Sequence, residues 1–432
     1  MFHAPRKGAK VRRFQWISVA LLVLVGIINL LDRSTLSIAN TYVRADLHIS
    51  DAQMGFLLSA FSLAYAFAQL PVGVALDRMG SRLVLGVGLC VWSVAQLCGG
   101  LVTSFHQFIV ARVVLGIGES PTFPAGAKMI ANWFNQRERG TPTGVFLSAP
   151  TISPMLAPPI LTGLTMAYGW RNMFIIMGVA GIVLSVIWYV IARDRKDVEL
   201  TPEENSYFDG SSEPEAPKRV LSFAEWRGLF TQPTMWGIVL GFVGVIYGVW
   251  LYLTWLPDYL KAERHLTFAK VGVVACIPYI FATLGALSSG VLADWLLDRG
   301  ANPINSRKWP ICLGLLGGAG FSIPFAYASA TTTAIVWLCF VLFFLYLASA
   351  GAWALVNVAT PGHMIATVGG FQNFGGYLGG SLAPIITGWL KQHTGSFRAS
   401  LLLSAAVAFV AAFVYLLLVR APIRDIAPDA DK

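Results

Sequence analysis

Two stretches of the chain place charged side chains inside sequence that is otherwise apolar. Asp32 and Arg33 interrupt the segment INLLDRSTLSIAN, and Arg112 and Glu119 begin and end the segment RVVLGIGE. A charge at the centre of a bilayer costs roughly 2.5–3.5 kcal/mol on insertion scales, so such residues are retained where they pair or face a wet cavity. These four residues are therefore the first candidates for function.

The spacing of these residues places one acid and one base on a single face of each segment. Asn29, Asp32 and Arg33 are three and four positions apart, which is one face of a helix. Arg112 and Glu119 are seven positions apart, about two turns, and share a face as well. If the two helices pack together, the four charges form a buried cluster that is nearly neutral.

Such a cluster has two interpretations. A carboxylate that loses or gains an arginine neighbour changes its proton affinity, because a guanidinium favours the charged form and desolvation favours the neutral form. A proton carrier would work in this way, and a guanidinium could also bind the carboxylate of a substrate through two parallel hydrogen bonds. The alternative is a set of buried ion pairs that only fix helix packing. We favour proton coupling.

The elements that position these charges are membrane spans. Of the 432 residues, 56% are hydrophobic and only 12% are charged, about half the charged fraction of an average soluble protein. A span needs about 20 mostly apolar residues, and about twelve such segments predict an all-α polytopic membrane protein. The expected spans are 16–40, 52–76, 82–102, 106–128, 141–165, 171–192, 233–256, 268–296, 309–328, 332–356, 364–390 and 397–419.

A polar interval divides these spans six and six. Residues 193–231 carry charges of both signs with Pro, Gly and Ser and lack an apolar period, which is typical of a solvated linker. We therefore expect three parts: an N-terminal six-helix bundle at 1–192, a cytoplasmic linker at 193–231 and a C-terminal six-helix bundle at 232–432.

The two halves resemble each other. GVALDRMGSR at 73–82 is similar to GVLADWLLDRG at 290–300, and APPILTG at 157–163 is similar to APIITG at 383–388. The two pairs are separated by nearly the same number of residues. A chance match of one apolar pair is plausible, but two pairs in register indicate a duplicated six-span unit, as in a major class of transporters.

Basic residues predict the orientation of the chain. With twelve spans, most of those outside the apolar segments fall on one side: Arg6, Lys7, Lys10, Arg12, Arg13, Arg78, Arg82, Arg137, Arg139, Arg193, Arg195, Lys196, Arg299, Arg307 and Lys308. Fewer fall on the other side: Lys261, Arg264, Lys270, Lys391 and Arg398. Because cytoplasmic loops are enriched in Lys and Arg, both termini are expected in the cytoplasm.

These motifs together resemble the major facilitator superfamily along nearly the whole chain. GVALDRMGSR resembles its loop between spans two and three, and RVVLGIGE resembles its span-four motif. LLDRSTLSIAN, SLAYAFAQLPVG and GESPTFPAGAKMIANWF resemble the anion:cation symporter branch. The resemblance implies two pseudo-symmetric six-helix bundles that import organic anions, often sugar acids, with protons.

The resemblance also implies roles for the four charges. Asp32 and Glu119 match protonation positions of the branch, and Arg33 and Arg112 match arginines tied to coupling or substrate. Of the two arginines, we expect Arg112 to contact the substrate carboxylate. Tyr65 matches a tyrosine of relatives that could bind an anion.

Four further polar residues are expected in the substrate site. Tyr65 and Gln69 are four apart and share a face of span two, where Tyr65 either binds the anion or is a packed aromatic. Gln372 and Asn373 lie in GGFQNFGGYLGG, whose glycines allow a close approach to the backbone. Their amides suit the hydroxyl or carboxylate groups of a substrate.

Other residues bear on gating and on the choice of substrate. Asp77, Arg78 and Arg82 lie at the cytoplasmic ends of spans two and three, where they can pair with helix termini, so we assign them to gating. Leu30 and Pro150 stand where the resemblance leads us to expect polar side chains. This departure keeps an aromatic carboxylate or a dicarboxylate open as an alternative substrate.

The expected function is proton-coupled import of a small organic anion by alternating access. A sugar acid (hexuronate, aldonate or aldarate) is the leading substrate class, and a non-transporting membrane sensor is the alternative of another class. An enzyme is not expected, since catalytic clusters, metal-ligand spacings and a phosphate-binding loop with Lys are absent from the sequence. We expect a monomer in the bacterial inner membrane, with protons as coupling ion, no other cofactor and no nucleic-acid partner.

Overall fold

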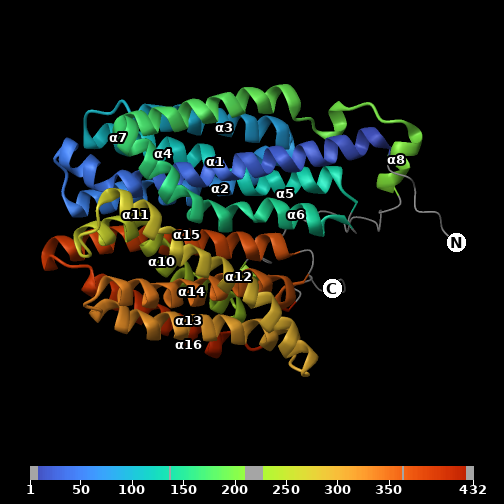
Figure 1. Ribbon diagram of the computed structural model, residues 1–432. Helices are drawn as coiled ribbons and strands as arrows, with labels where there is room; N and C mark the ends of the chain where they lie inside the picture. The colour runs from blue at the N-terminus through green and yellow to red at the C-terminus, as the bar shows by residue number, and fades with distance from the viewer. Residues whose placement is uncertain (1–7, 136–137, 210–226, 362–363, 425–432) are drawn as a thin grey trace. The chain divides into compact units, whose positions relative to one another are not determined.

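The computed structural model describes residues 8–135, 138–209, 227–361 and 364–424, and in this part of the chain the regular structure is entirely helical (Figure 1). The helices are α1 (Ala9–Leu47), α2 (Asp51–Met79), α3 (Ser81–Gly99), α4 (Phe105–Glu119), α5 (Thr122–Trp133), α6 (Gly140–Leu147), α7 (Ala149–Ile191), α8 (Pro202–Asp209), α10 (Pro233–Ala262), α11 (Phe268–Val274), α12 (Cys276–Asp298), α13 (Pro303–Tyr327), α14 (Thr331–Ala359), α15 (Ile365–Thr394) and α16 (Arg398–Leu418). The predicted all-α membrane fold is confirmed.

Several of the twelve spans are bent or broken helices. Among the described residues, eight helical stretches are long and apolar enough to cross a membrane, and α2 adds a ninth. The stretch Gly140–Ile191 contains two spans that meet at Gly169, whose φ of 80° favours glycine. The remaining two spans are α4 with α5, and α15, which gives the expected twelve.

The described chain packs as two compact units. The first contains the described residues of Met1–Ala39 and Ala64–Pro217, and the second contains Asn40–Leu63 and those of Lys218–Lys432. The end of α1 and the first half of α2 therefore pack with the C-terminal helices.

Glycines allow close helix crossings in the first unit. Helix α3 lies beside α4 and α7 (Figure 1). A Cβ atom on Gly88 of α3 would lie 2.6 Å from the carbonyl oxygen of Gly118 on α4. A Cβ atom on Gly178 of α7 would lie 2.5 Å from the backbone nitrogen of Leu97. Since no side chain fits at these crossings, the backbones themselves are in contact.

Glycines also allow close helix crossings in the second unit. Helix α10 packs along α15, and α13 packs along α14 and α16. A Cβ atom on Gly379 of α15 would lie 2.6 Å from the Val243 carbonyl oxygen, and one on Gly376 would lie 2.6 Å from the Phe242 ring. The glycine-rich sequence of α15 thus explains its close contact with α10.

The first part of the linker is folded, which differs from the solvated segment that its composition predicted. Helix α8 follows a short 3-10 turn at Arg195–Asp197. Its Tyr207 is only 3% exposed, and the Tyr207 hydroxyl accepts from Gln15 Nε2 at 3.1 Å and donates to Glu138 at 2.5 Å. Two adjacent aromatic residues, Tyr207 and Phe208, bury enough surface to hold this helix on the first unit.

Some residues of the predicted linker and topology lie outside the described part of the chain. These are linker residues 210–226 and the topology residues Arg6, Lys7 and Arg137.

Candidate functional site

Helices α1 and α4 bring the four predicted charges together in the first unit. Arg33 Nε donates to Glu119 Oε2 at 2.7 Å, and both side chains are at least 95% buried. Asp32 is fully buried, and Arg112 is 3% exposed. The positive charge of Arg112 interacts electrostatically with the carboxylates of both Glu119 and Asp32. The spacing of these residues along α1 and α4 therefore leads to a real buried cluster.

The two acids of this cluster have different surroundings. Glu119 is paired with Arg33. Neither carboxylate oxygen of Asp32 has a hydrogen-bond partner among the described residues, although Trp92 and the charges of Glu119 and Arg112 act on it. Burying an ionised carboxylate without hydrogen bonds has a large desolvation cost. Asp32 is thus the acid whose surroundings fit a bound proton.

Aromatic rings hold Arg33 in place. Its guanidinium carbon lies 4.8 Å from the centre of the Tyr65 ring and 6.0 Å from that of Phe123. A cation over an aromatic face is attracted by the ring quadrupole. Tyr65, which is 1% exposed, therefore belongs to the site through its ring, a contact that its spacing from Gln69 did not predict.

Hydrogen bonds around the cluster involve residues that the sequence patterns did not single out. Asn29 Nδ2 donates to Thr122 Oγ1 at 3.1 Å, and Gln96 Nε2 donates to Thr35 Oγ1 at 3.0 Å. The Thr35 hydroxyl in turn donates to the Asp32 carbonyl oxygen at 2.7 Å. Gln96 is an amide in an apolar span and could have been found by the criterion that identified Gln69. Thr122 could not, because it follows a helix break.

Gln69 lies where α2 bends. The arms Asp51–Gln69 and Pro71–Met79 meet at 54°. Pro71 lacks a backbone N–H and disrupts the helix, so Gln69 ends the first arm. Its side chain is half-buried.

The two predicted amides of α15 belong to the second unit. Gln372 is fully buried, and neither its Nε2 nor its Oε1 has a hydrogen-bond partner in the part of the chain that the structure describes. Asn373 is half-buried. A buried polar group without a partner is costly, so Gln372 is suited to a ligand that supplies hydrogen bonds. The structure thus places predicted substrate residues in both units.

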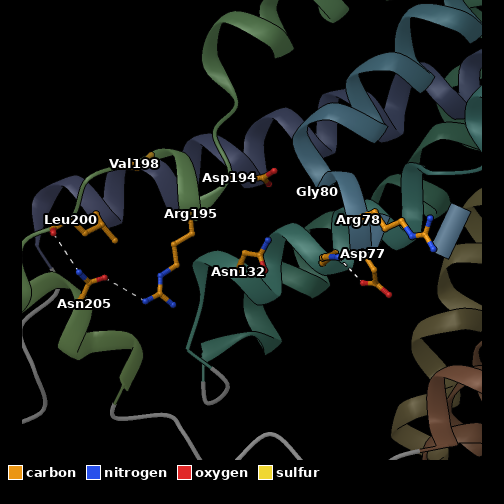
Figure 2. Close-up of a pocket in the computed structure, with 10 residues that line it drawn as sticks. Asp77, Arg78, Gly80, Asn132, Asp194, Arg195, Val198, Leu200 and Asn205 are labelled. Atoms are coloured by element: carbon orange, nitrogen blue, oxygen red, sulfur yellow. Dashed lines mark hydrogen bonds and ion pairs between the residues drawn. The ribbon is translucent and has the colours of Figure 1, made fainter. Parts of the chain in front are cut away.

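Asp77 and Arg82, two of the three predicted gating residues, form contacts within the first unit, and Figure 2 shows the contact of Asp77. Lys128 Nζ of α5 binds Asp77 Oδ1 at 2.7 Å and the Leu76 carbonyl oxygen at 2.7 Å. The backbone N–H of Arg82 donates to Asp194 Oδ2 at 3.2 Å, and its Nη2 donates to the Tyr189 carbonyl oxygen at 2.9 Å. These contacts tie the adjacent ends of α2 and α3 to α5 and to the end of α7.

A polar cavity of about 510 Å³ lies beside these contacts. Asp77, Arg78, Lys128, Asp194 and Arg195 are among its lining residues (Figure 2). Within the described residues, no three His, Cys, Asp or Glu side chains meet in a way that could hold a metal ion.

The family follows from a match over most of the chain. Residues 22–384 match the model of the Major Facilitator Superfamily. The chain belongs to the major facilitator superfamily. The predicted family, and a transporter rather than an enzyme, are therefore confirmed.

Similar proteins agree with this assignment. The chain is 44% identical over 420 residues to a probable L-galactonate transporter of Escherichia coli strain K12, which covers 97% of this chain and 92% of that protein. It is 33% identical to a probable galactarate/D-glucarate transporter of the same strain, covering 96% of each. It is 31% identical to a hexuronate transporter of Bacillus subtilis strain 168, covering 93% and 94%.

Solved structures show the same fold. A bacterial homologue of the human lysosomal transporter Spinster, in an inward-facing and unoccupied conformation, has a TM-score of 0.80 at 18% identity, covering 94% of this chain and 97% of that one.

Proposed function

We propose that this transporter imports a sugar acid (a hexuronate, aldonate or aldarate) together with protons by alternating access. The buried cluster of Asp32, Arg33, Arg112 and Glu119 carries the proposal, because it joins groups that bind a proton to groups that bind an anion. The names of the similar proteins support the substrate class. L-galactonate is the first compound to test, since the 44% identical relative is named for it.

The cluster supports a definite order of events. Asp32 takes up a proton, which removes its negative charge. Arg112, whose charge interacts with both acids, then loses one negatively charged neighbour and can bind the carboxylate of the substrate through two parallel hydrogen bonds. Glu119 and Arg33 remain paired while Asp32 is loaded and are the second acid–base pair of the cycle. A proton and an anion thus cross together with little net charge buried.

Polar side chains outside the cluster bind the rest of the substrate. The amides of Gln372 and Asn373 and the side chain of Gln69 suit the hydroxyl groups of a sugar acid, and the Tyr65 ring holds the Arg33 guanidinium. The relatives named for sugar acids outweigh the departures at Leu30 and Pro150, so an aromatic acid is not our proposal.

We also infer the setting in which the protein works. Asp77, Arg78 and Arg82 act in gating at the cytoplasmic face, and both termini lie in the cytoplasm of a bacterium. A single chain supplies both acids and both arginines, which is consistent with a functional monomer.

Counterflow in proteoliposomes tests the function directly. Vesicles preloaded with unlabelled L-galactonate should take up the labelled compound without a proton gradient. Arg112→Ala should weaken apparent affinity at least about tenfold, since a charge-assisted contact is lost. Arg112→Lys should recover only part of it, because lysine keeps the charge without the planar fork. Failure of the unaltered protein to exchange any sugar acid would reject the proposal, and unchanged affinity in Arg112→Ala would move the anion site elsewhere.

A further inference from the structure

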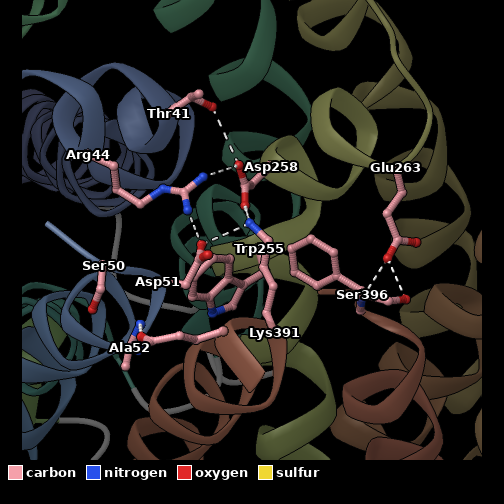
Figure 3. Close-up of polar contacts among 12 residues, drawn as sticks. Thr41, Arg44, Ser50, Asp51, Ala52, Trp255, Asp258, Glu263, Lys391 and Ser396 are labelled. Atoms are coloured by element: carbon pink, nitrogen blue, oxygen red, sulfur yellow. Dashed lines mark hydrogen bonds and ion pairs between the residues drawn. The ribbon is translucent and has the colours of Figure 1, made fainter. Parts of the chain in front are cut away.

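The second unit contains a cluster of four charges that the transport proposal does not use (Figure 3). Arg44 lies near the end of α1, Asp51 begins α2, Asp258 lies near the end of α10, and Lys391 lies near the end of α15. Each acid binds both bases, so the four side chains form a closed and neutral ring. We call this set the charge square.

The contacts of the charge square are short. Arg44 binds Asp51 through Nη1 and binds Asp258 Oδ1 through Nη2 at 3.1 Å. Lys391 Nζ lies 2.9 Å from Asp51 Oδ1 and 2.5 Å from Asp258 Oδ2. Thr41 Oγ1 adds a hydrogen bond to Asp258 at 3.4 Å.

Burial makes these contacts sensitive to the loss of one partner. The side chain of Asp258 is only 1% exposed and that of Lys391 is 9% exposed, whereas Arg44 and Asp51 are about a fifth exposed. The Lys391 ammonium also lies 5.4 Å from the centre of the Trp255 ring. Removing one member of a buried pair leaves an uncompensated charge, which is far more destabilising than the loss of a surface pair.

Next to the charge square, α2 and α15 are in backbone contact. A Cβ atom on Gly55 would overlap the Pro384 carbonyl oxygen, and one on Gly388 would overlap the Asp51 carbonyl oxygen. The Ser59 hydroxyl donates to the Ser381 carbonyl oxygen at 2.6 Å. Small residues along a helix face allow this approach. The charge square therefore closes one end of a tightly packed helix pair.

The chain's path places the charge square at one face of the membrane. Successive spans cross in opposite directions, so the connections α1–α2, α10–α11 and α15–α16 lie on the side opposite the N-terminus. In the proposed orientation this side is external. Residues 40–63 pack here with the C-terminal helices, whereas the rest of the described N-terminal half packs in the other unit.

We propose that Arg44, Asp51, Asp258 and Lys391 form an external lock that keeps the entrance closed and breaks once in every transport cycle. The inference rests on the proposed alternating-access function and orientation. An entrance between these helix ends cannot open while α1 and α2 are bound to α10 and α15. Opening also separates Arg44 and Lys391 from the two acids, so that both cations can attract an incoming anion.

Cysteine labelling tests the lock without measuring transport. Ser59→Cys, in a background in which the five native cysteines are replaced, puts a thiol in the fully buried α2–α15 contact. A membrane-impermeant maleimide added to intact cells reaches this thiol only when the external side opens. Adding Asp258→Asn should raise the labelling rate at least about tenfold, because Lys391 and Arg44 then share a single acid.

A matched control uses another acid at the same end of α10. Glu263 Oε1 accepts from the Ser396 hydroxyl at 2.8 Å and from the Phe397 N–H, and it makes no contact with the charge square (Figure 3). Glu263→Gln should label at the parent rate. Asp258→Glu, which keeps the negative charge between Arg44 and Lys391, should label much more slowly than Asp258→Asn.

The outcomes separate the lock from the transport function. Equal rates in the parent, in Asp258→Asn and in Lys391→Met would overturn the lock, and Lys391→Met covers the case in which Asp258→Asn does not fold. Counterflow by the unaltered protein is measured separately. Normal counterflow with unchanged labelling rejects only the lock, whereas absent counterflow rejects the transport proposal.

Discussion

At the scale of single residues, two buried acids in one cluster have different partners. Glu119 is held by Arg33 at 2.7 Å, whereas the Asp32 oxygens lack a hydrogen-bond partner among the described residues. This difference separates two roles that the sequence assigned jointly. We expect Asp32 to take up a proton first, while Glu119 stays paired with Arg33 as the second acid–base pair of the cycle.

Neutralising Asp32 should separate coupling from binding. Asp32→Asn should abolish accumulation driven by a proton gradient and leave counterflow intact, since the neutral amide mimics the protonated acid. Both modes are measured with labelled L-galactonate in the same vesicles. Concentrative uptake by Asp32→Asn would contradict the assignment.

The corresponding change at Glu119 should act on stability as well. Glu119→Gln leaves the Arg33 guanidinium without its carboxylate in a buried position, which costs about 3–5 kcal/mol. We expect a clear fall in Tm for Glu119→Gln and little change for Asp32→Asn. Equal Tm values would show that the Arg33–Glu119 pair is not structural.

Gln372 provides a test of substrate contact. Gln372→Leu should weaken sugar-acid binding by about tenfold, the equivalent of one good hydrogen bond. Its Tm should stay the same or rise, because a buried amide without a partner is removed. Binding is read from substrate-induced thermal shifts. A lower Tm with unchanged binding would instead assign Gln372 to the fold.

At the scale of helices, the cluster depends on where α4 packs and where it ends. Glu119 is the last residue of α4, and α5 begins at Thr122, so the break after α4 brings both Glu119 and Thr122 towards α1. Gly118, the residue before Glu119, lies at the crossing with α3. The helix crossing therefore sets the position of the acid.

Filling this crossing should disturb the site. A Cβ atom on Gly118 would lie 2.7 Å from the backbone nitrogen of Trp92 and 2.9 Å from its Cβ. Gly118→Ala should destabilise the protein by about 1–3 kcal/mol, the usual cost of overpacking, and should reduce counterflow. Gly163→Ala is the control, because the space around Gly163 is open. Equal Tm values for the two variants would show that α3 and α4 can move apart to accept the extra methyl group without a loss of stability.

At the scale of the whole molecule, the proton is a second substrate. Uptake should therefore rise as the external pH falls at constant internal pH, and Asp32→Asn should remove this dependence. Initial rates in vesicles with a set internal buffer measure it. A flat profile for the unaltered protein would indicate a uniporter, and the anion site could still be correct.

The sequence alone determined that the protein lies in a membrane, where its spans are, and which charged residues share a helix face. Composition requires a bilayer, and runs of apolar residues locate spans because the length of a helix needed to cross lipid is fixed. The spacing of Asp32 from Arg33, and of Arg112 from Glu119, predicts shared faces because helical periodicity is local. Similarity of motifs was enough to predict the superfamily that the comparisons confirm.

Only the tertiary structure decided which charges meet. Arg33 pairs with Glu119, 86 positions away, and Lys391 pairs with Asp51, 340 positions away. Within its own segment Lys391 resembles any basic residue at a helix end, so its sequence context indicates only topology. Ion pairs between helices depend on crossings set by residues such as Gly118 and Gly388. These crossings involve atoms far apart in the chain, so the periodicity of a single helix cannot predict them.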